Sequence, residues 1–330
     1  SGKTCVAALA MLQAAENGRQ AVLMAPTEIL AEQHYRKLAG WLAPLGLEVA
    51  WLSGSRKKKE REATLARLAA GEILLAVGTH ALIEDPVTLP GLALAVVDEQ
   101  HRFGVRQRLA LREKGQAGES PHMLMMSATP IPRTLAMSYY ADLDVSVLDE
   151  LPPGRSPIIT KLVAEARRDE VIQRVRAACL EGRQAYWVCP LIEESEALQL
   201  KTAEETFEML SAALPELPVG LVHGRLKNDV KSATMDAFVS GELKVLVATT
   251  VIEVGVDVPN ASLMVIEHAE RFGLSQLHQL RGRVGRGAAA SACVLLYATG
   301  ESGRLGETAR DRLRAMAETN DGFEIARRDL

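Results

Sequence analysis

The strongest constraint on the fold is a short apolar run, Leu92–Val97, that is followed immediately by Asp98 and Glu99. An uninterrupted apolar run of this length predicts a strand buried on both faces, as in parallel sheets. Open α/β sheets bind ligands at the carboxyl ends of their strands, which is where both acids lie. There, Asp98 suits a phosphate-bound Mg²⁺ and Glu99 suits polarisation of an attacking water. A lone acidic pair is also typical of a solvated turn, so other motifs decide between the two interpretations.

The first of these motifs is Ser1-Gly2-Lys3-Thr4, which matches the end of the phosphate-binding pattern G-x-x-x-x-G-K-[ST]. Apolar spacing from Thr4 to Asn17 predicts a helix, whose N-terminus favours bound anions. We expect Gly2 and Lys3 to contact phosphates and the Thr4 hydroxyl to bind Mg²⁺. An ordinary helix start is the alternative, and Asp98-Glu99 favours the phosphate site. Because the first glycine of the pattern would precede Ser1, we expect this chain to be a piece of a longer protein.

Strand and helix patterns alternate along the whole chain. Helical spacing is clearest at residues 29–42 and 57–70. Apolar runs predict strands at residues 21–25, 49–52, 73–77, 92–97, 123–126, 158–163, 185–189, 219–222, 245–248, 263–267 and 294–297. Such alternation predicts an α/β protein with doubly wound, mostly parallel sheets flanked by helices.

Two features predict two domains. Residues 151–157, L-P-P-G-R-S-P, cannot continue a helix or a central strand, so we place the boundary there and expect domains at 1–155 and 156–318. In addition, residues 52–79 align without gaps with residues 222–249, with identities that include Gly71/Gly241 and Thr79/Thr249. Both copies read as strand, glycine, charged helix, Gly-Glu, strand and threonine. This repeat indicates duplicated domains.

The composition limits where ligands can bind. The chain has 330 residues, of which 48% are hydrophobic and 24% charged, with 38 basic and 42 acidic residues and a net charge of −4. Any contact with nucleic acid must therefore come from local patches. The four cysteines show neither disulfide nor zinc spacing, and we expect buried thiols, no metal cluster and a reducing, cytoplasmic location. His34, His122 and His268 also lack ligand spacing, and no apolar run is long enough for a membrane.

A second charged motif lies far downstream at residues 279–286, Q-L-R-G-R-V-G-R. If the segment from Ser275 is helical, Arg283 and Arg286 share one face. An arginine supplied to a phosphate from another domain raises kcat by about 10³–10⁵. A surface basic cluster is the alternative, but glycine costs a solvated helix about 1 kcal/mol per site, which favours a functional role.

Polar residues follow several other predicted strands. Ser127 and Thr129 come after one of them, and with Gln100 and His101 we expect them to couple the nucleotide's state to the rest of the domain. Thr129 is also a good helix cap. Candidate nucleic-acid contacts lie at matching strand ends, where a cap or turn is at least as good an interpretation for each alone; they are Pro26, Thr27, Thr79, His80, Gly224, Arg225, Thr249 and Thr250. Asp257, further on, is placed to reach a ribose hydroxyl.

With these residues in place, the chain resembles superfamily 2 helicases and, among them, the RecG family of branched-DNA helicases. The resemblance rests on residues 25–34 (APTEILAEQH), 98–105 (DEQHRFGV), 126–134 (MSATPIPRT), 276–287 and the stretch from Tyr140 to Arg155. It extends over essentially the whole chain.

The resemblance implies two RecA-like domains of the P-loop type that use ATP and Mg²⁺ to drive 3′→5′ movement on duplex DNA. It implies fork reversal and Holliday-junction migration in recombination and repair, with single-stranded DNA-binding protein as a partner. It places Lys3, Thr4, Asp98 and Glu99 on ATP–Mg²⁺, with Gln279, Arg283 and Arg286 opposite them. It makes residues 319–330 the start of a translocation motif. We expect this piece alone, without the family's amino-terminal wedge domain, to unwind DNA weakly or not at all.

Two other functions stay open at this level. The transcription-repair coupling translocase shares the Arg-Phe-Gly-Val and Ile-Pro-Arg-Thr motifs, and its partner is RNA polymerase. A non-hydrolytic, ATP-gated nucleic-acid clamp belongs to another class. Glu99 and the two arginines disfavour the clamp, because a clamp needs no activated water.

Overall fold

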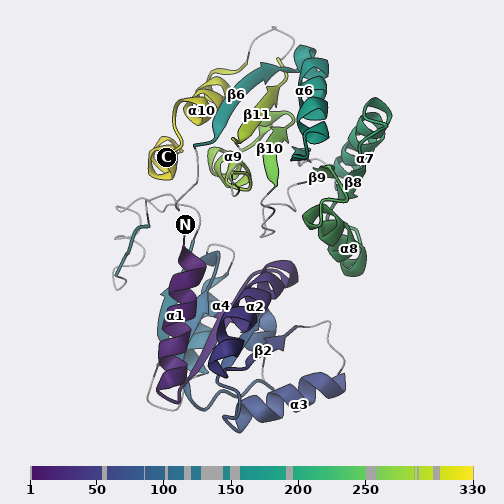
Figure 1. The fold of residues 1–330 in the computed structure, drawn as a ribbon. Coiled ribbons are helices and arrows are strands. Elements are labelled where there is room, and N and C mark those ends of the chain that lie inside the picture. Colours follow the sequence, from purple (N-terminus) through teal and green to yellow (C-terminus); the bar gives the residue numbers. More distant parts are fainter. Residues whose placement is uncertain are drawn as a thin grey trace. The chain divides into compact units, whose positions relative to one another are not determined.

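The protein is described here from a computed structural model. The described residues are 2–53, 58–84, 86–100, 103–114, 120–127, 144–148, 157–190, 196–249, 258, 260–285, 287, 290–299 and 305–329. They form two compact units, one holding the first five strands and the other the remaining six (Figure 1). The predicted boundary at residues 155 and 156 lies outside the described residues.

The first unit is built on a five-stranded sheet with strand order β2-β3-β1-β4-β5. All of its strand pairs are parallel. The strands are β1 (Gln20–Met24), β2 (Val49–Leu52), β3 (Leu75–Gly78), β4 (Leu92–Val97) and β5 (His122–Met125). β1 and β3 are buried at every position, as expected for strands covered on both faces.

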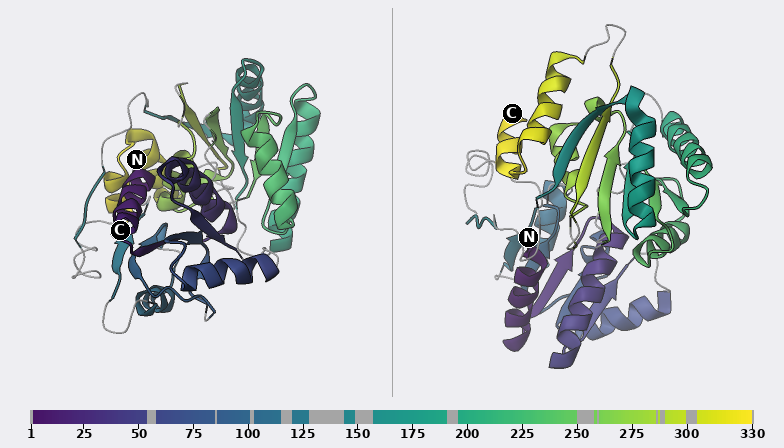
Figure 2. Two further views of the ribbon diagram at one scale, coloured as in Figure 1. Left: turned by 60° about the horizontal axis from the view of Figure 1, so that its bottom comes forward. Right: turned by 45° about the horizontal axis from the view of Figure 1, so that its top comes forward.

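Helices cover both faces of this sheet. They are α1 (Lys3–Glu16), α2 (Glu28–Leu42), α3 (Lys58–Ala69) and α4 (Val105–Glu113), with short 3₁₀ turns η1 (Ala43–Leu45) and η2 (His80–Leu82). α1 and α2 lie side by side and contact the strands β1 to β4 (Figures 1 and 2). A separate apolar cluster joins Leu68 of α3, Leu82 of η2 and Leu111 of α4 to the strands.

The second unit has a six-stranded sheet with strand order β6-β11-β10-β7-β9-β8, and its pairs are again all parallel. The strands are β6 (Ile159–Ala164), β7 (Gln184–Val188), β8 (Val219–Val222), β9 (Val245–Ala248), β10 (Ala261–Ile266) and β11 (Ala292–Tyr297). The predicted α/β class and parallel sheets are therefore confirmed in both units.

Two apolar layers enclose the second sheet. The helices are α6 (Arg168–Leu180), α7 (Glu196–Ala213), α8 (Asn228–Val239), α9 (Leu274–Arg281), α10 (Glu307–Glu318) and α11 (Gly322–Arg328), with 3₁₀ turns η4 (Glu165–Arg167) and η6 (Ala269–Arg271). α6 and α7 pack on one face, while α8 to α11 pack on the other. The yellow C-terminal helices and the teal α6 accordingly lie on opposite sides of the sheet (Figure 2).

The internal repeat has the same structure in both units. β2, α3 and β3 correspond to β8, α8 and β9 at a constant offset of 170 residues. A buried glutamine opens the central strand of each sheet: the Gln20 side chain donates to the carbonyls of Leu68 and Ile73, and the Gln184 side chain donates to the carbonyls of Phe238 and Leu243. The acceptors are equivalent in the repeat, so the two units share one folding plan.

Three of the four cysteines are buried, as predicted. Burial raises the pKa of Cys179 to about 11 and the pKa values of Cys189 and Cys293 to about 12, so these thiols stay protonated. The prediction of burial is wrong for Cys5, which is exposed because it faces away from the sheet in the first turn of α1. Within the described ranges, no helix combines the length and apolarity needed to cross a bilayer.

Candidate active site

The candidate site lies at the carboxyl edge of the first sheet. Because its strands are parallel, the segments that follow them meet at this edge. These segments hold the predicted residues Pro26, Thr27, Thr79, His80, Asp98, Glu99, Gln100 and Ser127. The positive charge of Lys3, the first residue of α1, acts on the Asp98 carboxylate. The fold therefore brings the phosphate-binding motif and the acidic pair together.

Asp98 is a buried carboxylate held by hydrogen bonds on both oxygens. It is 7% exposed. Its Oδ1 accepts the backbone N–H of Glu99 at 3.0 Å, and its Oδ2 lies 2.7 Å from Nε2 of His34. Burial alone would raise the pKa of Asp98, but the bond to His34, the charges of His34 and Lys3 and the Glu99 N–H outweigh burial and lower it. Asp98 is therefore ionised at neutral pH, as a cation ligand must be.

Glu99 has an unusual backbone conformation. Its φ is +50°, in the left-handed region that residues other than glycine rarely adopt. Residues are held in such a conformation only by their surroundings, and they cluster at functional sites. Here the bond from its N–H to Asp98 and the bond from the Gln100 N–H to the Met126 carbonyl (3.1 Å) hold the chain on either side.

The start of α1 fits a phosphate group. Gly2 is left-handed with φ +69°, and a Cβ built on it would meet nothing within 4 Å. Lys3 and Thr4 follow in the first helical turn, where backbone N–H groups lack intrahelical partners. An ammonium, a hydroxyl and an ionised carboxylate are the donor set that a nucleotide with Mg²⁺ requires. Lys3, Thr4 and Asp98 therefore fit ATP–Mg²⁺.

The predicted coupling segments are bonded to each other. The Gln100 N–H donates to the Met126 carbonyl, which ties the chain after β4 to the segment that leads into Ser127. Gln100 is buried, and its Oε1 has no partner among the described residues. His101 and Thr129 lie outside the described residues.

The candidate nucleic-acid contacts differ in exposure. Thr27 caps α2, with its Oγ1 accepting the Leu30 N–H at 3.4 Å, as the alternative interpretation predicted. Thr79 and Thr249 are buried at 3% and 4% exposure. His80, Gly224 and Arg225 are exposed, and Pro26 and Thr27 are half-buried. Thr250 is not among the described residues.

In the second unit, the motif at residues 279–286 is only partly helical. α9 ends at Arg281, because Gly282 caps it and Gly285 is left-handed with φ +77°. The expected helical face shared by Arg283 and Arg286 is therefore wrong. Gln279 lies in the last turn of α9, and Arg283, which is 9% exposed, lies in the turn beyond it. Arg286 and Asp257 fall outside the described residues.

Arg281 has a structural role that the sequence did not reveal. It is 2% exposed, and its Nη1 donates to the carbonyls of Met316 (2.8 Å) and Thr319 (2.9 Å) and to the Thr160 hydroxyl (3.3 Å). These bonds join α9 to β6 and to the end of α10. In the sequence, Arg281 could not be distinguished from its two neighbouring arginines.

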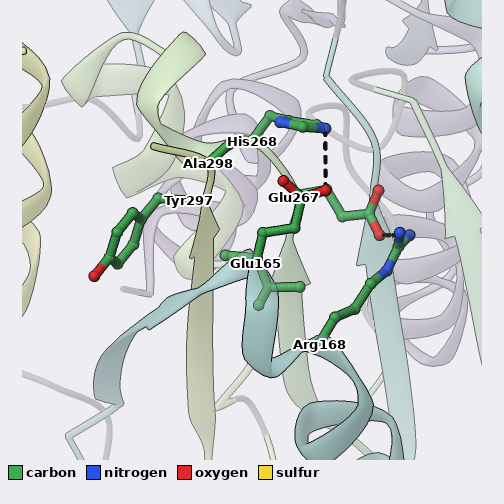
Figure 3. A pocket seen from close by; sticks show the side chains of 7 residues that line it. Glu165, Arg168, Glu267, His268, Tyr297 and Ala298 are labelled. Carbon is green, nitrogen blue, oxygen red and sulfur yellow. Dashed lines mark hydrogen bonds and ion pairs between the residues drawn. The ribbon is translucent and has the colours of Figure 1, made fainter. Parts of the chain in front are cut away.

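A small pocket lies at the carboxyl edge of the second sheet (Figure 3). Glu267 and His268 follow β10 there as Asp98 and Glu99 follow β4, and His268 is likewise left-handed, with φ +46°. Glu267 pairs with Arg168 and accepts the indole N–H of Trp187 at 2.7 Å. At the edge where Asp98 lies near Lys3 in the first unit, the second unit thus has an internal ion pair between Arg168 and Glu267.

Comparison with known proteins agrees with this geometry. Residues 1–138 match the DEAD/DEAH box helicase family, and residues 167–288 match the helicase conserved C-terminal domain. The ATP-dependent DNA helicase RecG of Escherichia coli K12 is 62% identical over 332 aligned residues, which cover 100% of this chain and 47% of that protein. A structure of RecG bound to a three-way DNA junction matches with a TM-score of 0.80 at 45% identity, covering 100% of this chain and 42% of that one. Over its whole length, the chain matches the helicase domains of RecG proteins.

The chain spans about half the length of the curated RecG relatives that it matches. It contains the two helicase domains of a larger protein. More distantly, S. cerevisiae Dbp5 bound to RNA and ADP BeF3 matches with a TM-score of 0.70 at 18% identity, covering 94% of this chain and 80% of that one. That likeness shows the shared fold of two tandem RecA-like domains.

Proposed function

We propose that this chain is the ATP-driven motor of a 3′→5′ branched-DNA helicase that acts on replication forks and Holliday junctions. The observation that supports this most is the buried, ionised Asp98, placed beside Lys3 and followed by the strained Glu99. Identity to RecG proteins supports this branch over the transcription-repair coupling translocase.

Each residue has a defined part in the proposed reaction. Lys3 holds the β- and γ-phosphates, while Thr4 and Asp98 hold Mg²⁺, which neutralises charge on the phosphates. Glu99 accepts a proton from the attacking water as the water oxygen bonds to the γ-phosphorus. The bond from that phosphorus to the bridging oxygen then breaks, and ADP and phosphate leave. Arg283 and Arg286 stabilise the charge that develops on the transferred group.

The nucleic-acid partner in this proposal is branched double-stranded DNA. Pro26, Thr27, Thr79, His80, Gly224, Arg225, Thr249 and Thr250 are the candidate contacts to its backbone. In support, His80, Gly224 and Arg225 are exposed. Because the chain as a whole has a net charge of −4, contact with DNA depends on such local positions. Gln279 and Asp257 are further candidate contacts to the nucleotide.

The test is steady-state ATP hydrolysis by the protein that carries this core with a complete phosphate loop. The rate is measured without nucleic acid and with single-stranded DNA, duplex DNA, a fork and RNA. We expect duplex and fork DNA to stimulate hydrolysis. Glu99→Gln should lower turnover by about 10²-fold or more with nucleotide binding unchanged, because it removes the proton acceptor. Stimulation by RNA alone would contradict the DNA substrate, and full turnover in Glu99→Gln would contradict the role of Glu99.

A further inference from the structure

His34 is a polar residue in the apolar stripe of α2. The buried residues of this helix are Leu30, Ala31, His34, Leu38 and Leu42. His34 is 5% exposed, and its Nε2 lies 2.7 Å from Oδ2 of Asp98. Because a carboxylate only accepts hydrogen bonds, Nε2 carries the proton and donates it. A buried polar ring is kept in a core only by such a partner.

This contact controls how the Asp98 carboxylate is oriented. The carboxylate has two hydrogen-bonded oxygens, with the Glu99 N–H on Oδ1 and the His34 ring on Oδ2. The two side chains of the pair are only 7% and 10% exposed, so water has little access to replace the imidazole. Without His34, Asp98 would keep one of these two bonds and could rotate about its side-chain torsions.

The same helix also reaches the candidate DNA contact. α2 begins directly after Thr27, whose side chain caps it, and its first residue, Glu28, accepts a hydrogen bond from the Ser53 hydroxyl at 2.6 Å. At a rise of about 1.5 Å per residue, the seven steps from the cap Thr27 to His34 span about 10 Å. A displacement of the start of α2 is therefore transmitted to His34 without an intervening loop.

We propose that His34 is a positioning residue that holds the Asp98 carboxylate in the orientation needed for Mg²⁺–nucleotide and transmits DNA contact at Pro26–Thr27 to it. This inference rests on the proposed function and extends it to a residue outside the nucleotide-binding and acidic motifs. Residues that orient a metal ligand from behind typically contribute 10- to 100-fold to metal affinity or activity.

The test compares two amides at this position in the protein with its complete phosphate loop. Gln places its amide nitrogen near the location of Nε2, whereas the Asn side chain is one methylene shorter. The readout is equilibrium binding of a fluorescent ADP with and without Mg²⁺. We expect His34→Gln to keep the Mg²⁺-dependent gain in affinity within about threefold, and His34→Asn and His34→Ala to reduce it by about 10- to 100-fold.

Leu38→Ala is the matched control. Leu38 lies one turn further along the same stripe and is fully buried, so its truncation weakens packing of α2 without removing a bond to Asp98. It should lower the Tm and leave the Mg²⁺-dependent gain unchanged. If Leu38→Ala and His34→Asn lose the Mg²⁺-dependent increase in ADP affinity equally, His34 has only a packing role and the proposal is overturned. The proposal is also overturned if His34→Asn shows the same Mg²⁺-dependent increase as the wild-type protein.

The proposed transmission from the DNA contact to Asp98 is tested by the ratio of ATP hydrolysis rates with and without duplex DNA. We expect this ratio to fall in His34→Asn and to return in His34→Gln, measured at saturating Mg²⁺ so that weaker metal binding is compensated. An unchanged ratio in His34→Asn would overturn the coupling. If no DNA stimulates the wild-type protein, the proposed function fails, while the ADP-binding arm still decides the positioning role.

Discussion

At the scale of single residues, two side chains occupy strained backbone positions. Among the described residues, Glu99 and His268 are the non-glycine residues with positive φ, and each is the second residue after an equivalent strand. The first carries the proposed water-activating carboxylate. The pKa of His268 is raised, mainly by the Glu270 carboxylate, whose Oε1 lies 3.4 Å from Nδ1 of the ring. Strain at the same place in both domains indicates that this turn is part of the duplicated fold, and the proposed chemistry uses it in the first copy.

We therefore expect Glu99→Gly to be more stable than Glu99→Ala. Both variants lose the carboxylate, but only glycine adopts φ +50° without steric cost, a difference of about 1 kcal/mol. The free energy of unfolding from urea titration measures this difference. Histidine 268 supplies the internal control, since His268→Gly and His268→Ala should differ in the same direction. If the glycine and alanine variants at each position are equally stable, the surroundings of the residue, and not its φ, determine the loss of stability.

At the scale of elements, α9 organises the end of the second domain. Arg281 bonds α9 to β6 and to the end of α10, and its Nη2 lies 3.2 Å from Nδ1 of His278. Burial, with a smaller contribution from the Arg281 charge, lowers the pKa of His278 to about 4. A neutral His278 is thus built into the helix that carries Gln279 and precedes Arg283.

This pKa gives the second domain a stability that depends on pH. The folded pKa of His278, about 4, lies below its ordinary value of 6.5. The unfolded chain therefore takes up the proton first, and the stability contributed by His278 is fully present above pH 6.5 and is lost as the pH falls towards 4. Replacing His278 with Gln should flatten the pH dependence of the unfolding free energy in this window. An identical slope in both proteins would contradict the assignment.

At the scale of the whole molecule, one supersecondary unit is used twice. The order β2-β3-β1-β4 in the first sheet recurs as β8-β9-β7-β10 in the second. Gln20 and Gln184 bond equivalent carbonyls, and Gly71 and Gly241 are both left-handed, with φ +73° and +85°. The domains differ at the carboxyl edge, where the first keeps Lys3 near Asp98 and the second pairs Arg168 with Glu267.

The shared glutamine provides a test of this duplication. Gln20→Leu and Gln184→Leu each leave two buried carbonyls without their donor, which should cost about 1–3 kcal/mol. We expect hydrogen exchange to increase around α3 and β3 in Gln20→Leu and around α8 and β9 in Gln184→Leu, with the other domain unchanged. Increased exchange spread evenly over both domains in either variant would show that the glutamines do not act as local clamps.

Much of the fold could be predicted from local pattern. Val49–Leu52, Leu92–Val97, Val219–Val222 and Val245–Ala248 have the predicted bounds, and other strand ends shift by one or two residues. Apolar runs between helical patterns allow few other structures. The end of the helix within residues 279–286 could not be predicted in the same way, because arginine spacing alone does not show where a helix stops. Gly282 caps the helix, so α9 ends at Arg281.

Local sequence pattern accounts for the order of strands and helices and for the polar motifs at the strand ends, because these depend on residues that are close together along the chain. The sequence also reveals the duplication, because residues 52–79 align without gaps with residues 222–249. Which of those strand ends are neighbours depends on how the strands and helices pack. His34 and Asp98 are 64 positions apart, and they meet because β1, which leads into α2, pairs with β4. Arg281 finds its carbonyl partners 35 and 38 positions away by the same kind of packing. Such contacts depend on strand order and helix placement, which apolar periodicity does not encode.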